Sequence, residues 1–364
     1  MVDIVIIRSN PVVYDPRVAK IVRSLGKRYS ISVLGWNRTG ALKKTIDNYI
    51  VDLKLFNLKA PIGKPSLILY YPLFWIWVLI KLFVYRPRVV HACDVDTILP
   101  CYLYKIIFRK RLVFDVFDRY AMAYIPPKLT ALYSLVNLFE GFFGKKADVL
   151  ITVWEKVQST FRRKPKRCAI IMNCPEDHAI DKVKSEKDVM ILVYTGNIRR
   201  DRGLEEITAA IKDLKNVEFV IAGGIIDNEL LDRMLRVSNV KYKGVLQPSD
   251  ALDLEASSDV MVALYDLNVP LNRVSMSNKH FEAMMCGIPL ITNVGRELIN
   301  EVDYGIMVGY NDVNQIKAAV VYLRDDIELR RRLGNNGRKA FLQKYNWTIM
   351  EQELYKIYEN LLEK

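Results

Sequence analysis

Short runs of β-branched residues alternate with amphipathic stretches along nearly the whole chain, and this alternation limits the possible fold more than any other feature. The runs DIVIIRS, SISVLGW, RVVHAC, RLVFDVFD and DVLITV lie in the first half, and MILVYTG, VEFVIAGG, DVMVALYD and PLITNV in the second. Between them, stretches such as DPRVAKIVRSLGKR and LEEITAAIKDLK carry apolar residues at helical spacing. Alternating strands and helices are typical of α/β proteins with parallel sheets, and the pattern predicts two doubly wound halves.

The length of the chain also favours two domains. Single cores stop growing near roughly 250–300 residues, and this chain has 364. Polar residues replace the periodic apolar ones in CPEDHAIDKVKSEKD, residues 174–188, which therefore predicts a linker. We expect an N-terminal domain over 1–175 and a C-terminal domain over 186–345. An amphipathic helix over 346–364 follows, and we expect it to pack back on the first domain.

Cysteine usage and the first residues indicate a cytoplasmic protein. The five cysteines are scattered and lack any C-x-x-C spacing, which argues against a disulfide framework and a zinc site. The N-terminus MVDIVIIRSN has neither the positive region nor the small-residue cleavage site of a secretory signal.

Charge is distributed unevenly between the two halves. Residues 1–185 hold 31 Lys and Arg against 14 Asp and Glu, whereas the remainder holds 23 against 27. The whole net charge of +13 thus comes from the N-terminal half. Such asymmetry indicates an anionic partner for that half, either nucleic acid, a phosphorylated substrate or an acidic membrane surface.

One aromatic segment, PSLILYYPLFWIWVLIKLFVY over 65–85, departs from the pattern of a soluble domain. It holds 16 uncharged residues between Lys64 and Lys81. A spanning helix needs roughly 20 apolar residues, and Pro72 and Lys81 make this segment a poor candidate. Tryptophan and tyrosine with basic flanks are typical of a helix lying in the membrane surface, and a fully buried core helix is the alternative. The basic clusters YKIIFRKR and FRRKPKR in the same half favour the membrane surface.

The stretch VYTGNIRRDRGLEEI, which opens the second domain, has the composition of an anion-binding loop. Gly196 follows a strand, and Arg199, Arg200 and Arg202 precede Gly203 at the start of a helix. Glycine lets backbone approach a ligand, and arginines near a helix N-terminus suit phosphate oxygens. The loop predicts a diphosphate site, and an exposed basic turn is the alternative.

A second polar feature interrupts the apolar stretch SNKHFEAMMCGIPLI, residues 277–291. Lys279 and Glu282 are three residues apart, so on a helix they share one face. An ammonium suits a phosphate, and a carboxylate suits the two hydroxyls of a ribose. A plain salt bridge between the two is the alternative.

Three other kinds of site receive little support. Asp94 and Asp96 in HACDVDT form a D-x-D pair that could hold Mg²⁺ or Mn²⁺, but such short matches are common by chance, so we expect no metal. The sequence also lacks G-x-G-x-x-G and G-x-x-x-x-G-K-[ST], which removes the main support for a dinucleotide-dependent dehydrogenase or a P-loop NTPase. We expect no cofactor.

Taken in order, these stretches resemble the retaining glycosyltransferases of family 4, which have the GT-B fold. YDPRVAKIVRSL is similar to the D-P-R-V start of one branch, VVHACDVDT to its H-x-x-D segment, and IIMNCPE to the strand that crosses into the second domain. YTGNIRRDRGLEEI resembles the donor loop, SNKHFEAMMCGIPLI the helix of the Glu-x7-Glu motif, and YNWTIMEQELYKIYENLL the closing helix. The resemblance implies two Rossmann-like domains facing a central cleft, the first binding the acceptor and the second a nucleotide sugar.

The resemblance also implies roles for individual residues. Arg202 and Lys279 would hold the donor diphosphate as catalytic groups, and Glu282 would bind the ribose. The family motif continues through neighbouring positions that would complete the donor site: Gly196, Asn197, Arg199, Ser277 and Asn278.

The chain departs from the family pattern at several positions. Val274 stands where the first glutamate of the motif would be, and Asn197 stands where many members have arginine. Phe117 and Asp118 stand where many members have a histidine near the transferred sugar, so Asp118 or Asp115 is the substitute candidate. The residues expected on the acceptor side are Asp15, Arg17, His91, Asp94 and Asp115.

The function implied by the resemblance is metal-independent transfer of a sugar, with retention, from a nucleoside diphosphate sugar to an acceptor. The basic half and the aromatic segment favour a lipid-linked or phosphorylated acceptor at the inner face of the cell membrane, with no nucleic acid as partner. The alternatives are a nucleotide-sugar epimerase of the same fold and a non-catalytic basic module that binds membrane or nucleic acid.

Overall fold

The chain divides into two compact units in a computed structural model that describes residues 2–40, 46, 51–62, 64–126, 128–178 and 189–363. The first unit comprises Met1–Asn173 and Met350–Lys364, and the second comprises Cys174–Ile349. The sequence places the boundaries at 175, 186 and 345. Most of the expected linker, residues 179–188, lies outside the described residues.

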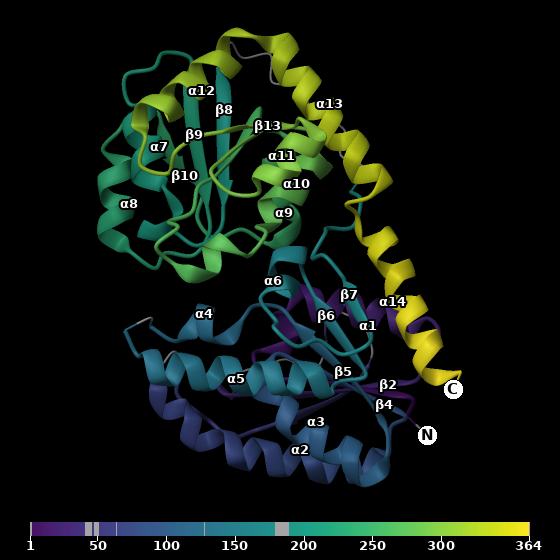
Figure 1. Cartoon of the computed structure of the whole chain (residues 1–364). Helices are drawn as coiled ribbons and strands as arrows, with labels where there is room; N and C mark the ends of the chain where they lie inside the picture. The colour runs from purple at the N-terminus through teal and green to yellow at the C-terminus, as the bar shows by residue number, and fades with distance from the viewer. Residues whose placement is uncertain are drawn as a thin grey trace. The chain divides into compact units, whose positions relative to one another are not determined.

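The N-terminal unit is built on a parallel sheet of seven strands in the order β3-β2-β1-β4-β5-β6-β7 (Figure 1). The strands are β1 (Ile4–Arg8), β2 (Ile31–Trp36), β3 (Asp52–Phe56), β4 (Val89–Cys93), β5 (Arg111–Val116), β6 (Val149–Thr152) and β7 (Cys168–Ile170). The helices are α1 (Pro16–Gly26), α2 (Tyr71–Tyr85), α3 (Val95–Phe108), α4 (Tyr120–Tyr124), α5 (Thr130–Lys146), α6 (Glu155–Ser159) and α14 (Trp347–Leu362).

The two faces of this sheet are covered by different helices because successive strand residues point to opposite sides. Val90 and Phe114 share one core cluster with Phe74 of α2, Ile98 of α3 and Phe143 of α5. On the opposite face, Tyr355 of α14 donates a hydrogen bond from its hydroxyl to the carbonyl oxygen of Ser24 in α1, at 2.9 Å. The C-terminal helix therefore completes the N-terminal unit from Met350 onward.

The C-terminal unit is built on a parallel sheet of six strands in the order β10-β9-β8-β11-β12-β13. The strands are β8 (Met190–Thr195), β9 (Val217–Ala222), β10 (Val240–Tyr242), β11 (Val260–Ala263), β12 (Leu290–Thr292) and β13 (Gly305–Met307). The helices are α7 (Leu204–Ile211), α8 (Asn228–Leu235), α9 (Pro248–Ala256), α10 (Asn278–Cys286), α11 (Arg296–Val302), α12 (Val313–Asp325) and α13 (Ile327–Gln343). Both sheets are therefore doubly wound, as the sequence predicts.

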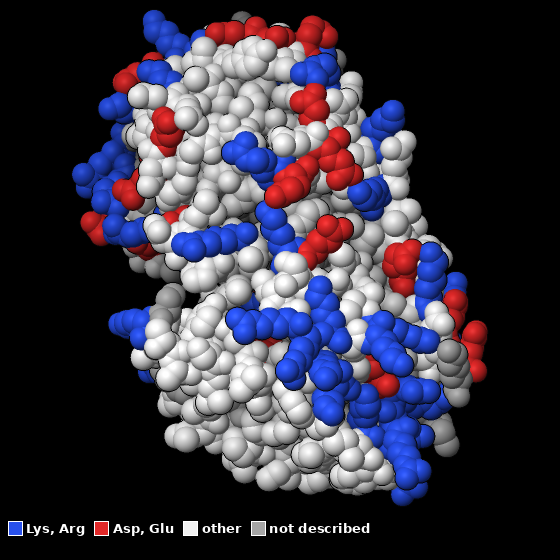
Figure 2. All heavy atoms as spheres, in the orientation of Figure 1, with Lys and Arg blue, Asp and Glu red and all other residues white. Residues whose placement is uncertain are grey.

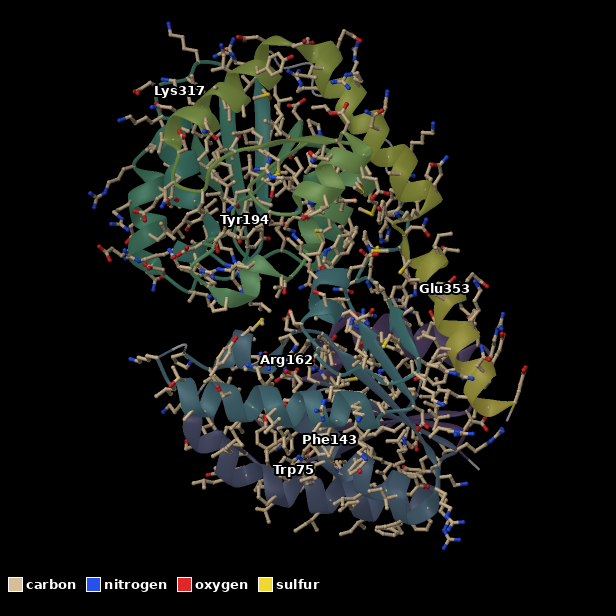
Figure 3. All side chains as sticks on the ribbon, in the orientation of Figure 1. Trp75, Phe143, Arg162, Tyr194, Lys317 and Glu353 are labelled. Carbon is tan, nitrogen blue, oxygen red and sulfur yellow. The ribbon has the colours of Figure 1, made fainter. Side chains whose placement is uncertain are left out.

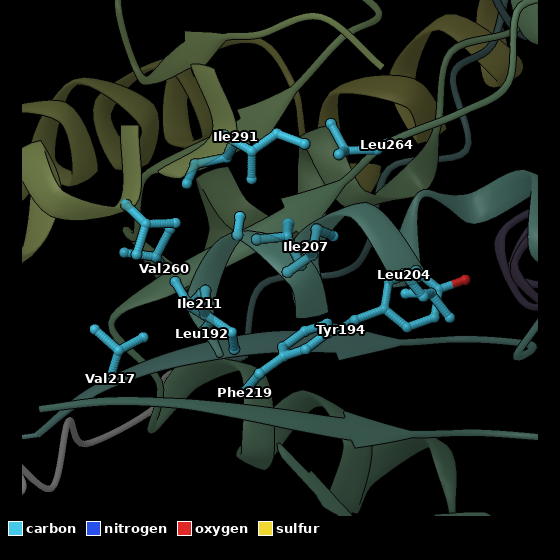
Figure 4. Packing of buried hydrophobic residues seen from close by; sticks show 14 of the residues in the cluster. Leu192, Tyr194, Leu204, Ile207, Ile211, Val217, Phe219, Val260, Leu264 and Ile291 are labelled. Atoms are coloured by element: carbon cyan, nitrogen blue, oxygen red, sulfur yellow. The ribbon is translucent and has the colours of Figure 1, made fainter. Parts of the chain in front are cut away.

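The core of the C-terminal unit forms between this sheet and α7 (Figure 4). Leu192 and Phe219 come from β8 and β9, and Ile207 and Ile211 from one face of α7. Tyr194 lies in the same cluster but carries a hydroxyl, which donates a hydrogen bond to the carbonyl oxygen of Asn197 at 3.0 Å. This bond ties the end of β8 to the loop that follows it.

The aromatic segment predicted from the sequence forms a 3-10 helix, η2 (Pro65–Tyr70), followed by α2. Ser66–Tyr85 is long and apolar enough to cross a membrane by length and composition. One side of α2 buries Phe74, Val78 and Leu82 against the sheet. Most of the remaining apolar side chains are exposed, so the alternative of a fully buried core helix is wrong. The exposed set is Ile68, Leu69, Leu73, Ile76, Ile80, Phe83 and Val84.

Candidate functional site

The strand order of the C-terminal sheet changes direction between β8 and β11, and open α/β sheets bind ligands beyond the carboxyl ends of strands at such a point. The chain leaves β8 through Gly196, whose φ of 148° favours glycine. A Cβ on Gly223, after the adjacent β9, would lie 1.9 Å from the carbonyl oxygen of Gly196. Two glycines thus let the segments after β8 and β9 approach each other closely, and no side chain covers the backbone at these two positions.

The three arginines of this loop have overlapping partners, and Arg202 also lies 3.7 Å from Asp201. Arg199 forms two hydrogen bonds to Asp201, at 2.9 and 3.2 Å, and Arg200 pairs with Asp227 and Glu229. Arg202 is the one whose guanidinium lies over an aromatic ring, 4.7 Å from the centre of Tyr265. Of the three, Arg202 is therefore the one directed over the switch point.

The N-terminus of α10 faces the same tyrosine. Ser277 is the N-cap residue, and its hydroxyl accepts a hydrogen bond from the amide of Lys279 at 3.2 Å. The same hydroxyl bonds the hydroxyl of Tyr265, which follows β11. Tyr265 therefore has Arg202 against its ring and the start of α10 against its hydroxyl.

Lys279 is held between two carboxylates. Its ammonium lies 3.0 Å from Glu255 at the end of α9, and it also pairs with Glu282 one helical turn away. Glu255 is almost fully buried and accepts a hydrogen bond from the hydroxyl of Thr195, the last residue of β8. The predicted pair of Lys279 and Glu282 is thus part of a network of four side chains from three elements.

The ionisation of this network depends on burial and on its charges. Burial acts to lower the pKa of Lys279, but Glu282 and Glu255 outweigh it and raise that pKa. Burial raises the pKa of Glu255, and the ammonium of Lys279 opposes this rise. The two carboxylates therefore favour the protonated form of Lys279, and its ammonium favours the ionised form of Glu255.

Sequence reasoning missed Glu255 and Tyr265, and it placed the other donor residues without their partners. Asn197 and Asn278 are exposed beside Gly196 and Lys279. Val274, in place of the first glutamate of the motif, ends the 3-10 helix η4 (Pro270–Arg273). The donor-binding roles of these residues stay predictions.

The N-terminal sheet has its own switch point, between β1 and β4. Arg8, the last residue of β1, pairs with Asp94 after β4 and, at 2.9 Å, with Asp15 at the start of α1. Asp94 has a φ of 63° and accepts a hydrogen bond from the amide of Phe117 at 2.9 Å. Burial raises the pKa of Asp94 to about 6, although Arg8 acts in the opposite direction.

Arg17, His91 and Asp115, which were expected on the acceptor side, lie buried inside the unit. Arg17 forms two hydrogen bonds to Asp115, at 3.1 and 2.8 Å, and a third to the carbonyl oxygen of Ile171. His91 lies 3.4 Å from Asp115 and bonds the hydroxyl of Tyr358 in α14. Because Arg17, His91 and Asp115 are buried and paired, they hold neighbouring groups in place, and their role on the acceptor side stays a prediction.

Phe117 connects this buried network to the switch point. The guanidinium groups of Arg8 and Arg17 lie 4.2 and 5.0 Å from the centre of its ring. Asp118 follows at a half-buried position, and its predicted role at the transferred sugar remains a prediction. Asp15 is the N-cap residue of α1 and accepts hydrogen bonds from the amides of Arg17 and Val18. This structural role accounts for an aspartate at the position, and its acceptor-side role stays a prediction.

The two carboxylates of the D-x-D stretch do not converge. Asp94 pairs with Arg8, whereas Asp96 accepts hydrogen bonds from the hydroxyls of Ser9 and Tyr71. Within the described ranges, no group of three or more metal-ligating side chains occurs.

Comparison with known proteins finds glycosyltransferases among the relatives of this chain. Residues 199–354 match a family model described as glycosyl transferase-like, over less than half of the chain. The chain is 25% identical over 187 residues to the capsular polysaccharide biosynthesis glycosyltransferase CapM of Staphylococcus aureus, which covers 49% of this chain and 48% of CapM. It is 21% identical over 294 residues to an uncharacterized glycosyltransferase of Methanocaldococcus jannaschii, MJ1069, with 73% of each covered. The chain thus spans about half the length of CapM.

Solved structures match over nearly the whole chain. Sucrose-phosphate synthase from Thermosynechococcus elongatus has a TM-score of 0.80 at 17% identity, covering 99% of both chains. HepE from Anabaena, in complex with UDP and glucose, has a TM-score of 0.76 at 12% identity, covering 99% of this chain and 100% of HepE. The fold is GT-B. This confirms the predicted fold class, and the glycosyltransferase relatives support a transferase enzyme; family 4 and its D-P-R-V branch stay predictions.

Proposed function

We propose that this protein is a retaining glycosyltransferase that takes a sugar from a nucleoside diphosphate sugar. The observation that carries the proposal is the convergence of Arg202 and the start of α10 on Tyr265 at the switch point of the C-terminal sheet. HepE, which shares the fold, has been solved with UDP and with UDP-glucose. A uridine nucleotide is therefore the first donor to test.

The departing diphosphate builds negative charge, and the residues at this switch point are suited to stabilise it. Arg202 supplies a guanidinium, Lys279 an ammonium, and the N-terminus of α10 a partial positive charge. In the proposed mechanism Glu282 turns to the ribose hydroxyls and gives up its hydrogen bond with Lys279. The ammonium can then donate to the phosphates, while Glu255 keeps Lys279 in place. We propose that these cations act without a metal ion, and activity that persists in excess chelator would support this.

The donor experiment separates three functions. Protein is mixed with uridine, guanosine and cytidine diphosphate sugars, and melting temperature, nucleotide release and sugar isomers are measured. Nucleotide release that depends on an acceptor supports transfer, and NMR of the product anomer then tests retention. Isomer formation without acceptor would indicate the epimerase. No melting shift with any nucleotide, together with salt-dependent binding to DNA or vesicles, would indicate the non-catalytic module.

We further propose that the acceptor is lipid-linked and that the protein works at the inner face of the cell membrane. On the N-terminal unit, apolar side chains of α2, α3 and α5 that cover the same face of the sheet remain exposed. Figure 2 shows a broad uncharged area on this unit with Lys and Arg side chains gathered beside it. Exposed apolar patches with a basic border are typical of surfaces that contact anionic membranes.

Vesicle binding tests this location with a matched control. Leu73 and Ile76 of α2 are 52% and 56% exposed, so replacing both with glutamate leaves the core intact. We expect the pair Leu73→Glu and Ile76→Glu to abolish flotation with vesicles of phosphatidylglycerol and phosphatidylcholine. The pair Ile327→Glu and Leu342→Glu introduces the same charge at two 52% exposed sites of the C-terminal unit and should float normally. Equal flotation of the two variants would contradict the proposed surface.

A further inference from the structure

The N-terminal unit contains a cavity that the donor site does not use. It has a volume of about 670 Å³ and lies between α4, one side of α5 and the segment 160–163 that follows α6. Pockets for small molecules span roughly 300–1,000 Å³, so the cavity exceeds what a phosphate ion needs. Figure 3 places Arg162 on one side of α5, and Phe143 and Trp75 on the other. The cavity therefore lies on the other side of α5 from Phe143 and Trp75, and it meets the core cluster at Phe161, which belongs to both.

The floor of the cavity is fixed by a buried arginine. Arg119 donates hydrogen bonds to Glu140 at 2.7 Å and to Asn137 at 2.8 Å, and it also bonds the hydroxyl of Thr160. Its guanidinium lies 4.2 Å from the centre of the Phe161 ring. Because Glu140 balances its charge, Arg119 is a structural group that holds α5 and the segment 160–163 in place.

The charges around the cavity have one sign. Lys145, Arg162 and Arg163 line it and are exposed, and no aspartate or glutamate lies among the described lining residues. Within the part of the chain that the structure describes, none of these three cations has an ion-pair partner. Three uncompensated cations beside one cavity favour an anion with several oxygen atoms, such as a phosphate.

The rest of the lining is apolar and continues onto the protein surface. Leu138 and Phe142 line the cavity from α5 and are 71% and 48% exposed. Phe142 also contacts Tyr102 of α3 edge-on, at 5.9 Å between ring centres. The apolar wall of the cavity thus joins the exposed apolar surface of α3 and α5. A ligand that fits has an anionic end and an apolar tail.

We propose that this cavity binds a phosphate group that carries a lipid tail, with the phosphate at Lys145, Arg162 and Arg163 and the tail along Leu138 and Phe142. This inference rests on the proposed function. The bound molecule is either the lipid-linked acceptor or a lipid of the membrane. Both sources share the phosphate and the tail.

Gly141 offers a direct test. It lines the cavity from α5, and a Cβ added there meets no atom within 4 Å. Glycine inside a helix costs about 1 kcal/mol relative to alanine, so substitution does not threaten the fold. Gly141→Phe fills the cavity, and Gly141→Ala is the matched control because it changes the helix in the same way without filling it.

Isothermal titration with dioctanoyl phosphatidic acid, dioctanoyl phosphatidylcholine and inorganic phosphate measures the site. We expect saturable binding of phosphatidic acid that weakens at least about tenfold in Gly141→Phe and changes by less than about twofold in Gly141→Ala. Arg162→Glu should weaken binding more than Arg167→Glu, which makes the same charge change outside the lining. Equal affinity in Gly141→Phe and the wild type, or inorganic phosphate binding as tightly as phosphatidic acid, would overturn the proposal.

Two further measurements separate the sources of the lipid and the two proposals. If the site holds a membrane lipid, Gly141→Phe weakens vesicle binding; if it holds the acceptor, vesicle binding persists and turnover with farnesyl phosphate is lost. UDP-induced melting shifts should be equal in the wild type and Gly141→Phe. Absence of that shift in the wild type counts against the donor site alone, because lipid binding is measured independently.

Discussion

Replacing Lys279 with methionine should destabilise the C-terminal unit more strongly than the loss of any surface charge. The side chains of Lys279, Glu255 and Glu282 are 14%, 2% and 18% exposed. Removing one partner from a buried ion pair costs about 3–5 kcal/mol, because the remaining charge is left without compensation. For a unit of this size, ~1 kcal/mol shifts the melting temperature by about 2–4 °C, so we expect a loss of roughly 6–20 °C.

The loss should also depend on pH in a defined direction. Without the ammonium of Lys279, burial raises the pKa of Glu255 further above its ordinary value. A carboxyl group whose pKa is higher in the folded state contributes stability below its unfolded pKa, and that contribution is lost as pH rises through the folded pKa. Lys279→Met should therefore be more destabilised at pH 8 than at pH 5.

Differential scanning calorimetry at both pH values measures this loss in the wild type, Lys279→Met, a double variant and a control variant. Lys279→Met combined with Glu255→Gln should recover most of the loss, because the uncompensated carboxylate is gone and the amide oxygen still accepts from Thr195. Lys344→Met is the matched control: it removes a pair with Glu301 whose side chains are 56% and 54% exposed, worth about 0–1 kcal/mol. The reasoning is refuted if Lys279→Met melts within about 2 °C of Lys344→Met, or if its loss is the same at both pH values.

Three further outcomes follow from the structure. In steady-state kinetics, Glu282→Ala should raise KM for the nucleotide sugar about tenfold or more, and Arg202→Ala should lower kcat by about 10²-fold with an unchanged melting temperature; wild-type kinetics in both would remove the donor assignment. Arg17→Met leaves Asp115 without its main partner and should cost about 3–5 kcal/mol in urea denaturation, whereas Arg331→Met, which breaks a surface pair with Glu328, should cost less than about 1 kcal/mol. Gly223→Ala forces a Cβ against the carbonyl oxygen of Gly196 and should cost at least about 2 kcal/mol more than Gly244→Ala, where the φ is also positive but no atom lies within 4 Å; equal costs would show that the backbone relaxes freely.

The strands and the donor loop could be predicted because their signals are local. β-branched runs gave the central strands of both sheets, and the spacing of Lys279 and Glu282 placed them on one turn of α10. The edge strands β3, β10 and β13 were not predicted, since each holds at most one β-branched residue. Of the fourth edge strand, β7, only Ile170 lies in the crossover strand that the resemblance implies.

The partners of charged residues could not be predicted because they are distant in sequence. Glu255 lies in the stretch LDLEASSD, which has the composition of an exposed helix, yet α9 ends with this carboxylate buried against Thr195 and Lys279. Arg17 lies in an amphipathic helix whose other charged residues suggest solvent, and only the fold brings it to Asp115 and Ile171. Burial of single charged residues is decided by tertiary contacts, which leave no periodic signal.

The docking of α14 on the N-terminal unit has a consequence for how the chain matures during translation. The hydroxyl of Tyr358 bonds the buried His91, and the ribosome synthesises Tyr358 only after the entire C-terminal unit. Until α14 has been synthesised, His91 lacks its tyrosine partner, and the N-terminal unit lacks the side chains that α14 buries. The N-terminal unit, which is synthesised first, is therefore completed only after the C-terminal unit has been made, when α14 docks on it.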